Sequence, residues 1–77
     1  MNVTRRRRIA ALQGKLNELQ EELSAILEEE QEAYDNFPES LQESERGQRM
    51  YEAIDNLENA VGCFEEIEGY LLEAFEC

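Results

Sequence analysis

Histidine and tryptophan are absent from this chain of 77 residues, and proline occurs only once. Without histidine, no Ser-His or Cys-His pair can activate a nucleophile, and the most frequent general base is missing. There is no glycine-rich phosphate loop, and two cysteines without histidine do not have the spacing of a zinc site. The sequence therefore predicts a protein that is not an enzyme and that holds neither a metal nor another cofactor.

Cysteine is scarce, and the two thiols are far apart in the sequence. Cys63 and Cys77 lie on one predicted helix, separated by about 21 Å at 1.5 Å per residue, so we expect no disulfide between them. No apolar run approaches the length of a membrane span, and no continuous apolar segment of a secretory signal follows the first residues. These features predict a chain that stays in the cytoplasm, with free thiols, and that binds no membrane.

Basic residues are few, and most of them are clustered. Seven Lys and Arg face nineteen Asp and Glu, for a net charge of −12. Residues 5–8 are all arginine, so residues 9–77 keep only three basic residues and carry a net charge of −16. Such a body repels nucleic acid and anionic membranes and attracts basic surfaces. Direct nucleic-acid binding is therefore not expected, whereas a protein partner with a basic surface is.

The composition favours long helices, and the first is expected over residues 4–35. Its apolar residues alternate at spacings of three and four, which is the pattern of a coiled coil with positions a and d apolar: Ile9, Leu12, Leu16, Leu19, Leu23 and Ile26. Glu30 interrupts position a, and Leu27 and Tyr34 at position e continue the stripe. Either the stripe widens into a core of several helices, or Glu30 faces a cationic partner.

A connection is expected over residues 36–44, where the helical pattern is forced to stop. Pro38 has no backbone donor and moves Phe37 out of the helical region, while Ser40 and Ser44 are both suitable helix caps. Phe37 and Leu41 place two apolar groups in this short connection. They either cap the end of a core or form a surface for a partner.

The second long helix is expected over residues 45–76, and the whole chain forms one antiparallel helical hairpin. The core series again alternates by three and four, with Glu68 as the single break: Met50, Ile54, Leu57, Val61, Phe64, Leu71 and Phe75. A second row repeats every seven residues: Ala53, Ala60, Ile67 and Ala74. Two adjacent rows make an apolar face wider than a simple hairpin buries. The sequence therefore predicts a homodimer in the form of a four-helix bundle, with a dimer face comprising Ala53, Ala60, Val61, Phe64, Ile67, Leu71 and Ala74.

The arginine cluster, comprising Arg5, Arg6, Arg7 and Arg8, has more than one interpretation. In a hairpin centred near residue 40, it lies opposite residues 72–75, where Glu73 and the end of a helix dipole attract cations. The cluster then holds the two ends of the chain together. The alternatives are a phosphate of a nucleic acid or cofactor, and an acidic protein partner.

The segment Pro-Glu-Ser-Leu-Gln-Glu-Ser-Glu-Arg-Gly at residues 38–47 resembles short, uncharacterised acidic helical-hairpin proteins of bacteriophages and mobile elements. The resemblance covers residues 28–57, and this segment is its specific part. It implies a phage or mobile-element origin and a site inside the bacterial host cell. It assigns no catalytic or binding residue.

These features favour an interaction module that binds a host or phage protein. One alternative is an acidic mimic of nucleic acid that inhibits a host defence or DNA-binding protein; another is a structural or scaffold piece of a phage particle. The candidate residues for the partner lie at the connection, beside it and at the amino terminus: Glu30, Tyr34, Phe37, Leu41, Arg5, Arg6, Arg7 and Arg8.

Overall fold

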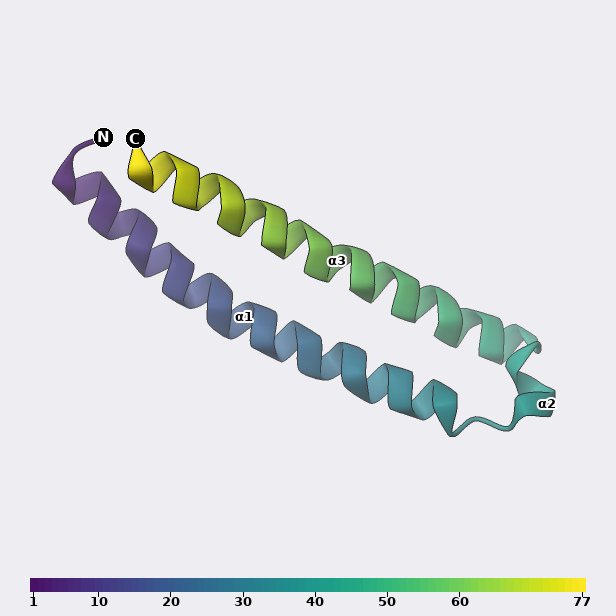
Figure 1. The fold of residues 1–77 in the computed structure, drawn as a ribbon. Helices are drawn as coiled ribbons and strands as arrows, with labels where there is room; N and C mark the ends of the chain where they lie inside the picture. Colours follow the sequence, from purple (N-terminus) through teal and green to yellow (C-terminus); the bar gives the residue numbers. More distant parts are fainter.

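The chain folds into a hairpin of two long antiparallel helices (Figure 1). The computed structural model describes residues 1–77 and contains α1 (Val3–Asp35), the short α2 (Glu39–Gln42) and α3 (Glu45–Glu76), without any strand. Helices α1 and α3 pack along their length, and α2 lies at the closed end, so the two termini meet at the other end. The expected all-helical class is confirmed, with two long helices packed against each other.

Both long helices begin at a side-chain cap. The Asn2 side chain accepts a hydrogen bond from the Arg5 amide at 2.8 Å, and Ser44 Oγ accepts one from the Gly47 amide at 3.3 Å. Each cap satisfies one of the amides that a helix leaves free in its first turn. Of the two serines considered from the sequence, Ser44 therefore caps α3. Pro38, with a φ of −54°, precedes α2.

Helix α3 begins in close contact with α2. Gly47 is one of only two buried residues, and a Cβ atom at this position would lie 2.2 Å from the Gln42 carbonyl oxygen. The Gln42 side chain in turn donates hydrogen bonds to the carbonyl oxygens of Tyr34, at 3.2 Å, and Phe37, at 3.3 Å. One of these acceptors belongs to the last turn of α1, and the other lies directly after the helix. The closed end is thus a compact turn that depends on a residue without a side chain.

The face of α1 that packs against α3 differs from the expected one. Half-buried residues occupy position a, at Ile9, Leu16 and Leu23, and also position e, which includes Leu27 and Tyr34. Position d is left exposed, at Leu12, Leu19 and Ile26. The apolar stripe of α1 is three rows wide, and one facing helix covers about two of them. Helix α1 is thus rotated toward position e, which carries the two large apolar residues of α1 nearest the turn, Leu27 and Tyr34.

Helix α3 contributes the row that was expected from its core series. Ile54 is the one buried hydrophobic residue, 5% exposed, and the remaining members are half-buried: Met50, Leu57, Val61, Phe64, Leu71 and Phe75. Glu68 occupies the interruption in this series and is half-buried too. One of its carboxylate oxygens, Oε1, is buried without a hydrogen-bond partner.

The hairpin is a thin rod with a large surface. It measures 58 × 16 × 12 Å, and its radius of gyration of 17.4 Å exceeds the value of about 11.5 Å for a compact domain of this length. Its accessible surface of 6051 Å² is about 1,200 Å² larger than expected for a compact monomer of this mass. No helix combines the length and apolar character that crossing a membrane requires.

Candidate interaction surfaces

The first candidate surface is the apex, which we define as Phe37, Leu41 and Arg46 at the closed end of the hairpin. Leu41 is 47% exposed, whereas Phe37 is half-buried. The Arg46 guanidinium carbon lies 5.6 Å from the centre of the Phe37 ring, in the range of a cation–π contact. Phe37 is therefore partly engaged within the chain, and Leu41 is the apolar side chain that the apex presents to solvent.

Acidic residues surround Leu41 on the same short segment. Glu39 and Glu43 flank it in sequence, and Glu45 begins α3; all three are exposed. Glu45 is paired with Arg49 at 2.5 Å, one turn further along α3, in the single ion pair of the structure. The apex thus combines one exposed leucine with carboxylates around it, which suits a partner with an apolar depression and a basic rim.

Tyr34 lies on one lateral edge of the hairpin, which we call the tyrosine edge. Its ring centre is 6.2 Å from that of Tyr51 across the two helices, and the two rings are tilted by 58°. Gln13 lies three heptads before Tyr34 on α1, and Leu72 lies three heptads after Tyr51 on α3. Both therefore lie on the same edge as the tyrosines, where they border a hollow. Tyr51 and Leu72 are 62% and 51% exposed. This edge carries aromatic and polar groups of both helices, and its two tyrosine rings are in contact with each other.

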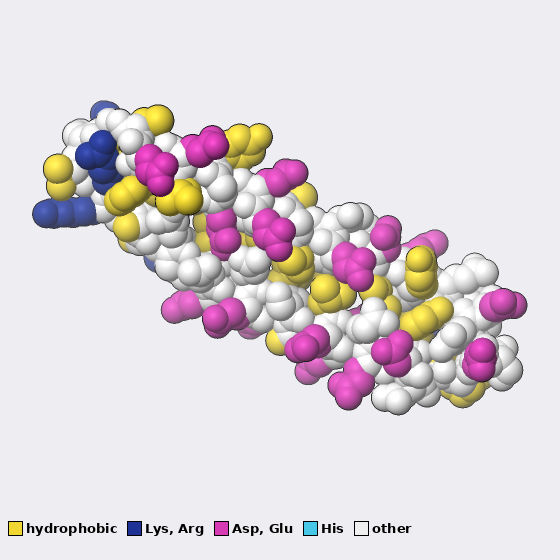
Figure 2. Space-filling view, in the orientation of Figure 1, with side chains coloured by type: hydrophobic (Ala, Val, Ile, Leu, Met, Phe, Trp, Pro, Cys, Tyr) yellow, Lys and Arg dark blue, Asp and Glu magenta, His cyan; other side chains and the backbone are white.

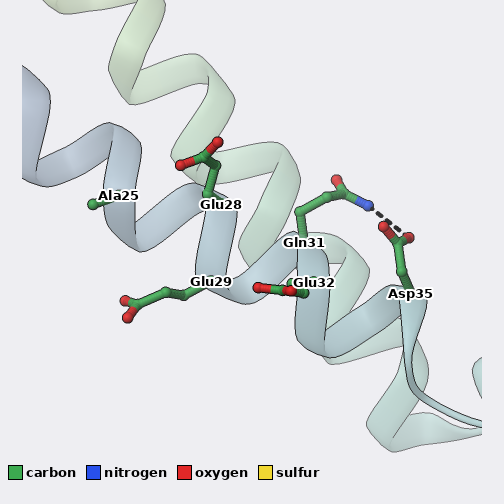
Figure 3. Close-up of a pocket in the computed structure, with 6 residues that line it drawn as sticks. All are labelled: Ala25, Glu28, Glu29, Gln31, Glu32 and Asp35. Atoms are coloured by element: carbon green, nitrogen blue, oxygen red, sulfur yellow. Dashed lines mark hydrogen bonds between the residues drawn. The ribbon is translucent and has the colours of Figure 1, made fainter.

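Glu30 is half-buried at the end of α1 nearest the turn, and it forms no ion pair or side-chain hydrogen bond. Its neighbours Glu28, Glu29 and Glu32 line an open hollow on the outer side of α1 together with Asp35 (Figure 3). Figure 3 shows the carboxylates of Glu28 and Glu29 pointing in different directions, and Gln31 donates a hydrogen bond to Asp35 at 3.1 Å. No group of three acidic or cysteine side chains in the structure could hold a metal ion. The hollow is an acidic surface without a converging ligand set.

The arginine cluster lies at the open end of the hairpin, where Figure 2 shows the basic side chains gathered. Arg6 is the half-buried member, and its Nε donates a hydrogen bond to the Phe75 carbonyl oxygen at 3.1 Å. The terminal amino group of Met1 likewise donates to the Cys77 carbonyl oxygen at 3.1 Å. The two ends are thus joined by hydrogen bonds to Phe75, in the last turn of α3, and to Cys77, directly after it. No arginine of the cluster forms an ion pair with Glu73 or Glu76. The other three arginines are exposed.

The residues expected at a dimer face fall into two groups. Val61, Phe64 and Leu71 are half-buried members of the series that packs against α1. The second row lies to one side of that series, where Ile67 is 45% exposed and the other members are small and half-buried: Ala53, Ala60 and Ala74. Of the two groups, only the second row has side chains that face away from α1 and can contact another molecule.

The structure also exposes a row that the sequence analysis placed in the hairpin core. Leu12, Leu19 and Ile26 are 49%, 52% and 48% exposed. On the helical wheel, these three residues lie beside the packed face of α1, on the side away from Tyr34. The second row lies beside the packed face of α3, on the side away from Tyr51. Since the two tyrosines are in contact on one side of the hairpin, both rows lie on the other side. We call this side the apolar edge, comprising Leu12, Leu19, Ile26, Ala53, Ala60, Ile67 and Ala74.

The signal for the apolar edge was present in the sequence but was ambiguous. The apolar stripe of α1 contains three rows, at positions a, d and e, and the expectation was that a and d would face α3. The widening of the stripe at Leu27 and Tyr34 already indicated that a third row existed. Which row remains outside depends on the rotation of α1 about its own axis, and the heptad spacing does not specify that rotation.

Comparison of the chain with models of protein families, with curated proteins and with solved structures finds no match.

Proposed function

We propose that this chain is a protein interaction module without enzymatic activity, which binds a host or phage protein inside a bacterial cell. The bacterial and phage context rests on the resemblance of residues 38–47 described above. The observation that carries the binding role is the exposed apolar surface. Ten large hydrophobic side chains are 44% or more exposed, whereas Ile54 alone is buried. A hairpin of this kind buries as much apolar surface as a stable domain only when another molecule covers part of its exposed apolar side chains.

The apex is the proposed contact for the partner. It is the part of the resemblance that is specific in sequence, and its exposed Leu41 has the exposed Glu39 and Glu43 two residues away on either side in the sequence. The turn beneath it is held by the Gln42 hydrogen bonds and by Gly47, so the apex is positioned before any partner arrives. A pre-positioned surface loses little conformational freedom on binding.

The test compares three versions of the chain as bait in a bacterial host lysate: the wild type, Leu41→Ser, and Leu72→Ser as a matched control. Both leucines are about half exposed, but Leu72 lies on the tyrosine edge of α3. We expect a protein, identified by mass spectrometry, that the wild type and Leu72→Ser retain and that Leu41→Ser loses. Equal retention by all three baits would contradict the apex as the contact surface.

A second candidate function is mimicry of nucleic acid. The observation that favours it is that eighteen of the nineteen acidic residues take part in no ion pair, since Glu45 with Arg49 is the only pair. Figure 2 shows acidic side chains spread along both helices of the rod. A DNA-binding protein with a basic cleft would recognise such a row of free carboxylates through its phosphate sites.

Competition with DNA and salt distinguishes the two functions. A protein captured through mimicry is displaced by added duplex DNA, and its affinity falls steeply between about 50 and 200 mM salt. A protein that binds the apex through Leu41 is retained under both conditions. Retention of the partner with excess DNA and with high salt would exclude mimicry.

A further inference from the structure

We propose that a second copy of this chain covers the apolar edge, with the two α1 helices antiparallel and a two-fold axis passing at Leu19. Leu12, Leu19 and Ile26 are spaced by seven residues, so they form a straight, exposed row on α1. Around Leu19, the row is symmetric, because Leu12 and Ile26 lie at equal distances on either side. An antiparallel copy therefore places Leu12 against Ile26 and Leu19 against itself. This inference does not depend on the external partner proposed above.

The charges beside this row are complementary to themselves. A charged and exposed residue lies one turn before each residue of the row, at its outer side: Arg8, Lys15 and Glu22. Glu29, which is also exposed, continues this line one turn after Ile26. In the antiparallel arrangement, Lys15 lies opposite Glu22 of the second copy. Arg8 lies opposite Glu29 of the second copy in the same way. The two-fold axis repeats each contact, so four attractive pairs border the apolar row.

The same charges exclude the neighbouring arrangements. A parallel pairing places Lys15 against Lys15 and Glu22 against Glu22. An antiparallel pairing shifted by one heptad places Lys15 opposite Lys15 of the second copy in one direction of the shift. In the other direction, it places Glu22 opposite Glu22 of the second copy. Like charges facing each other disfavour an assembly, so the charge pattern selects both the orientation and the register.

The row on α3 agrees with the same axis. Two contacts show which residues of α1 and α3 lie at the same level: Arg6 bonds to Phe75, and Tyr34 contacts Tyr51. Both helices rise by 1.5 Å per residue, so counting inward from these contacts places Leu19 level with roughly residues 62–66 of α3. The second row is symmetric about a point between Ala60 and Ile67, which falls within this range. An antiparallel second copy then places the small Ala60 against Ile67, and Ala53 against Ala74, which allows close packing of the two α3 helices.

The apolar edge is electrically neutral although the chain carries −12. Its border on α1 has two positive and two negative residues. Its border on α3 consists of Arg49, which is paired with Glu45, and the uncharged Asn56, Cys63 and Tyr70. The acidic excess of the chain lies on other faces. The surface in excess of a compact monomer, about 1,200 Å², also exceeds the roughly 800 Å² that each partner contributes to a standard interface.

Sedimentation equilibrium tests the surface. We expect the wild-type chain of 9.0 kDa to sediment as a dimer at tens of micromolar, and Leu19→Glu to sediment as a monomer. Leu72→Glu is the matched control, because Leu72 is equally exposed on the tyrosine edge; this variant stays dimeric. A wild-type monomer, a dimer of Leu19→Glu or a monomer of Leu72→Glu would each overturn the assignment.

A charge exchange tests the register. Lys15→Glu replaces two attractive contacts by two repulsive ones, and we expect the dimer dissociation constant to rise about tenfold. The double variant Lys15→Glu with Glu22→Lys restores opposite charges in the antiparallel register alone, so its dissociation constant returns to near the wild-type value. Both positions are exposed, and circular dichroism at 222 nm verifies that each variant stays helical. An unchanged constant in the single variant, or no recovery in the double variant, would overturn the register.

Discussion

Gly47 lies where the first turn of α3 touches α2, and replacing it with alanine tests how the closed end is built. A Cβ atom there would lie 2.2 Å from the Gln42 carbonyl oxygen and 2.6 Å from its carbonyl carbon. Both are backbone atoms, so no side-chain rotation relieves the overlap. The Gln42 segment would have to move, and it is held by the bonds from its side chain to Tyr34 and Phe37. Gly47→Ala therefore separates α2 from α3 or weakens these bonds.

The expected loss follows from two opposing effects. Overpacking of a close contact destabilises a fold by about 1–3 kcal/mol, and more where backbone must shift. Alanine in place of glycine in a helix contributes up to about 1 kcal/mol in the other direction. We expect a net loss of about 2 kcal/mol, which lowers the melting temperature by roughly 8–16 °C in a domain of this size.

Thermal unfolding followed by circular dichroism at 222 nm, at one fixed protein concentration, measures this loss. Gly14→Ala is the control, because a Cβ atom at Gly14 meets nothing within 4 Å on the same kind of long helix. We expect this control to gain about 0.5–1 kcal/mol. A Gly47→Ala variant as stable as Gly14→Ala would refute the close approach of α2 and α3.

Two further substitutions test single contacts between the long helices. Glu68→Leu removes the buried, unpaired carboxylate oxygen from the packed face of α3, and we expect a gain of about 1–3 kcal/mol in the free energy of unfolding by urea; Glu66→Leu, on an exposed position, should change it by less than about 0.5 kcal/mol. Arg6→Ala removes the hydrogen bond to Phe75 and should lower stability by about 0.5–1.5 kcal/mol, with faster amide exchange in the last turn of α3. Arg7→Ala, whose side chain forms no hydrogen bond or ion pair, should leave both the stability and the amide exchange unchanged. If Glu68→Leu had the same effect as Glu66→Leu, or Arg6→Ala the same effect as Arg7→Ala, the contact assigned to Glu68 or to Arg6 would be contradicted.

The helical class and the pairing of two long helices followed from the sequence for a simple reason. Apolar residues recur at spacings of three and four on both sides of a single proline, and this period has no counterpart in a strand. Glu30 and Glu68 each replace a single apolar position within a helix, whereas Pro38 and the serines around it stop the helical pattern, and they do so at one place. A chain with one break folds back once, so the hairpin was the expected result. Dimerisation stays a prediction.

The rotation of α1 did not follow from the sequence, because the pattern contains more apolar rows than one neighbour can cover. The heptad interpretation assigned Leu12, Leu19 and Ile26 to the core on spacing alone. The structure leaves them exposed, since α1 turns its e positions toward α3 near Tyr34 and keeps that rotation along its length. Polar residues at the same position, Gln13 and Gln20, are half-buried as a result.

The position of Arg6 beside the last turn of α3 followed from the sequence, and of the two attractions expected there, the helix end is the one that Arg6 contacts. The sequence put the arginine cluster beside the last turn of α3, where both carboxylates and free carbonyl groups attract cations. The bond that forms is to the Phe75 carbonyl oxygen and not to Glu73. Helical spacing gives the level of a residue along its partner helix, but it does not determine which of several acceptors at that level a long side chain reaches.

The apex and the apolar edge are separate surfaces, and this separation lets one chain use both. Self-association as proposed buries Leu19 and its row near the middle of the rod, whereas Leu41 lies at the closed end, outside that contact. In an antiparallel dimer, the two closed ends point in opposite directions. Each end of the proposed dimer then presents one apex, which leaves room for two of the proposed partner molecules. Because the edge between the copies is neutral, the acidic faces remain outward along the whole assembly, and a partner with a basic rim meets the same charges on the dimer as on a single hairpin.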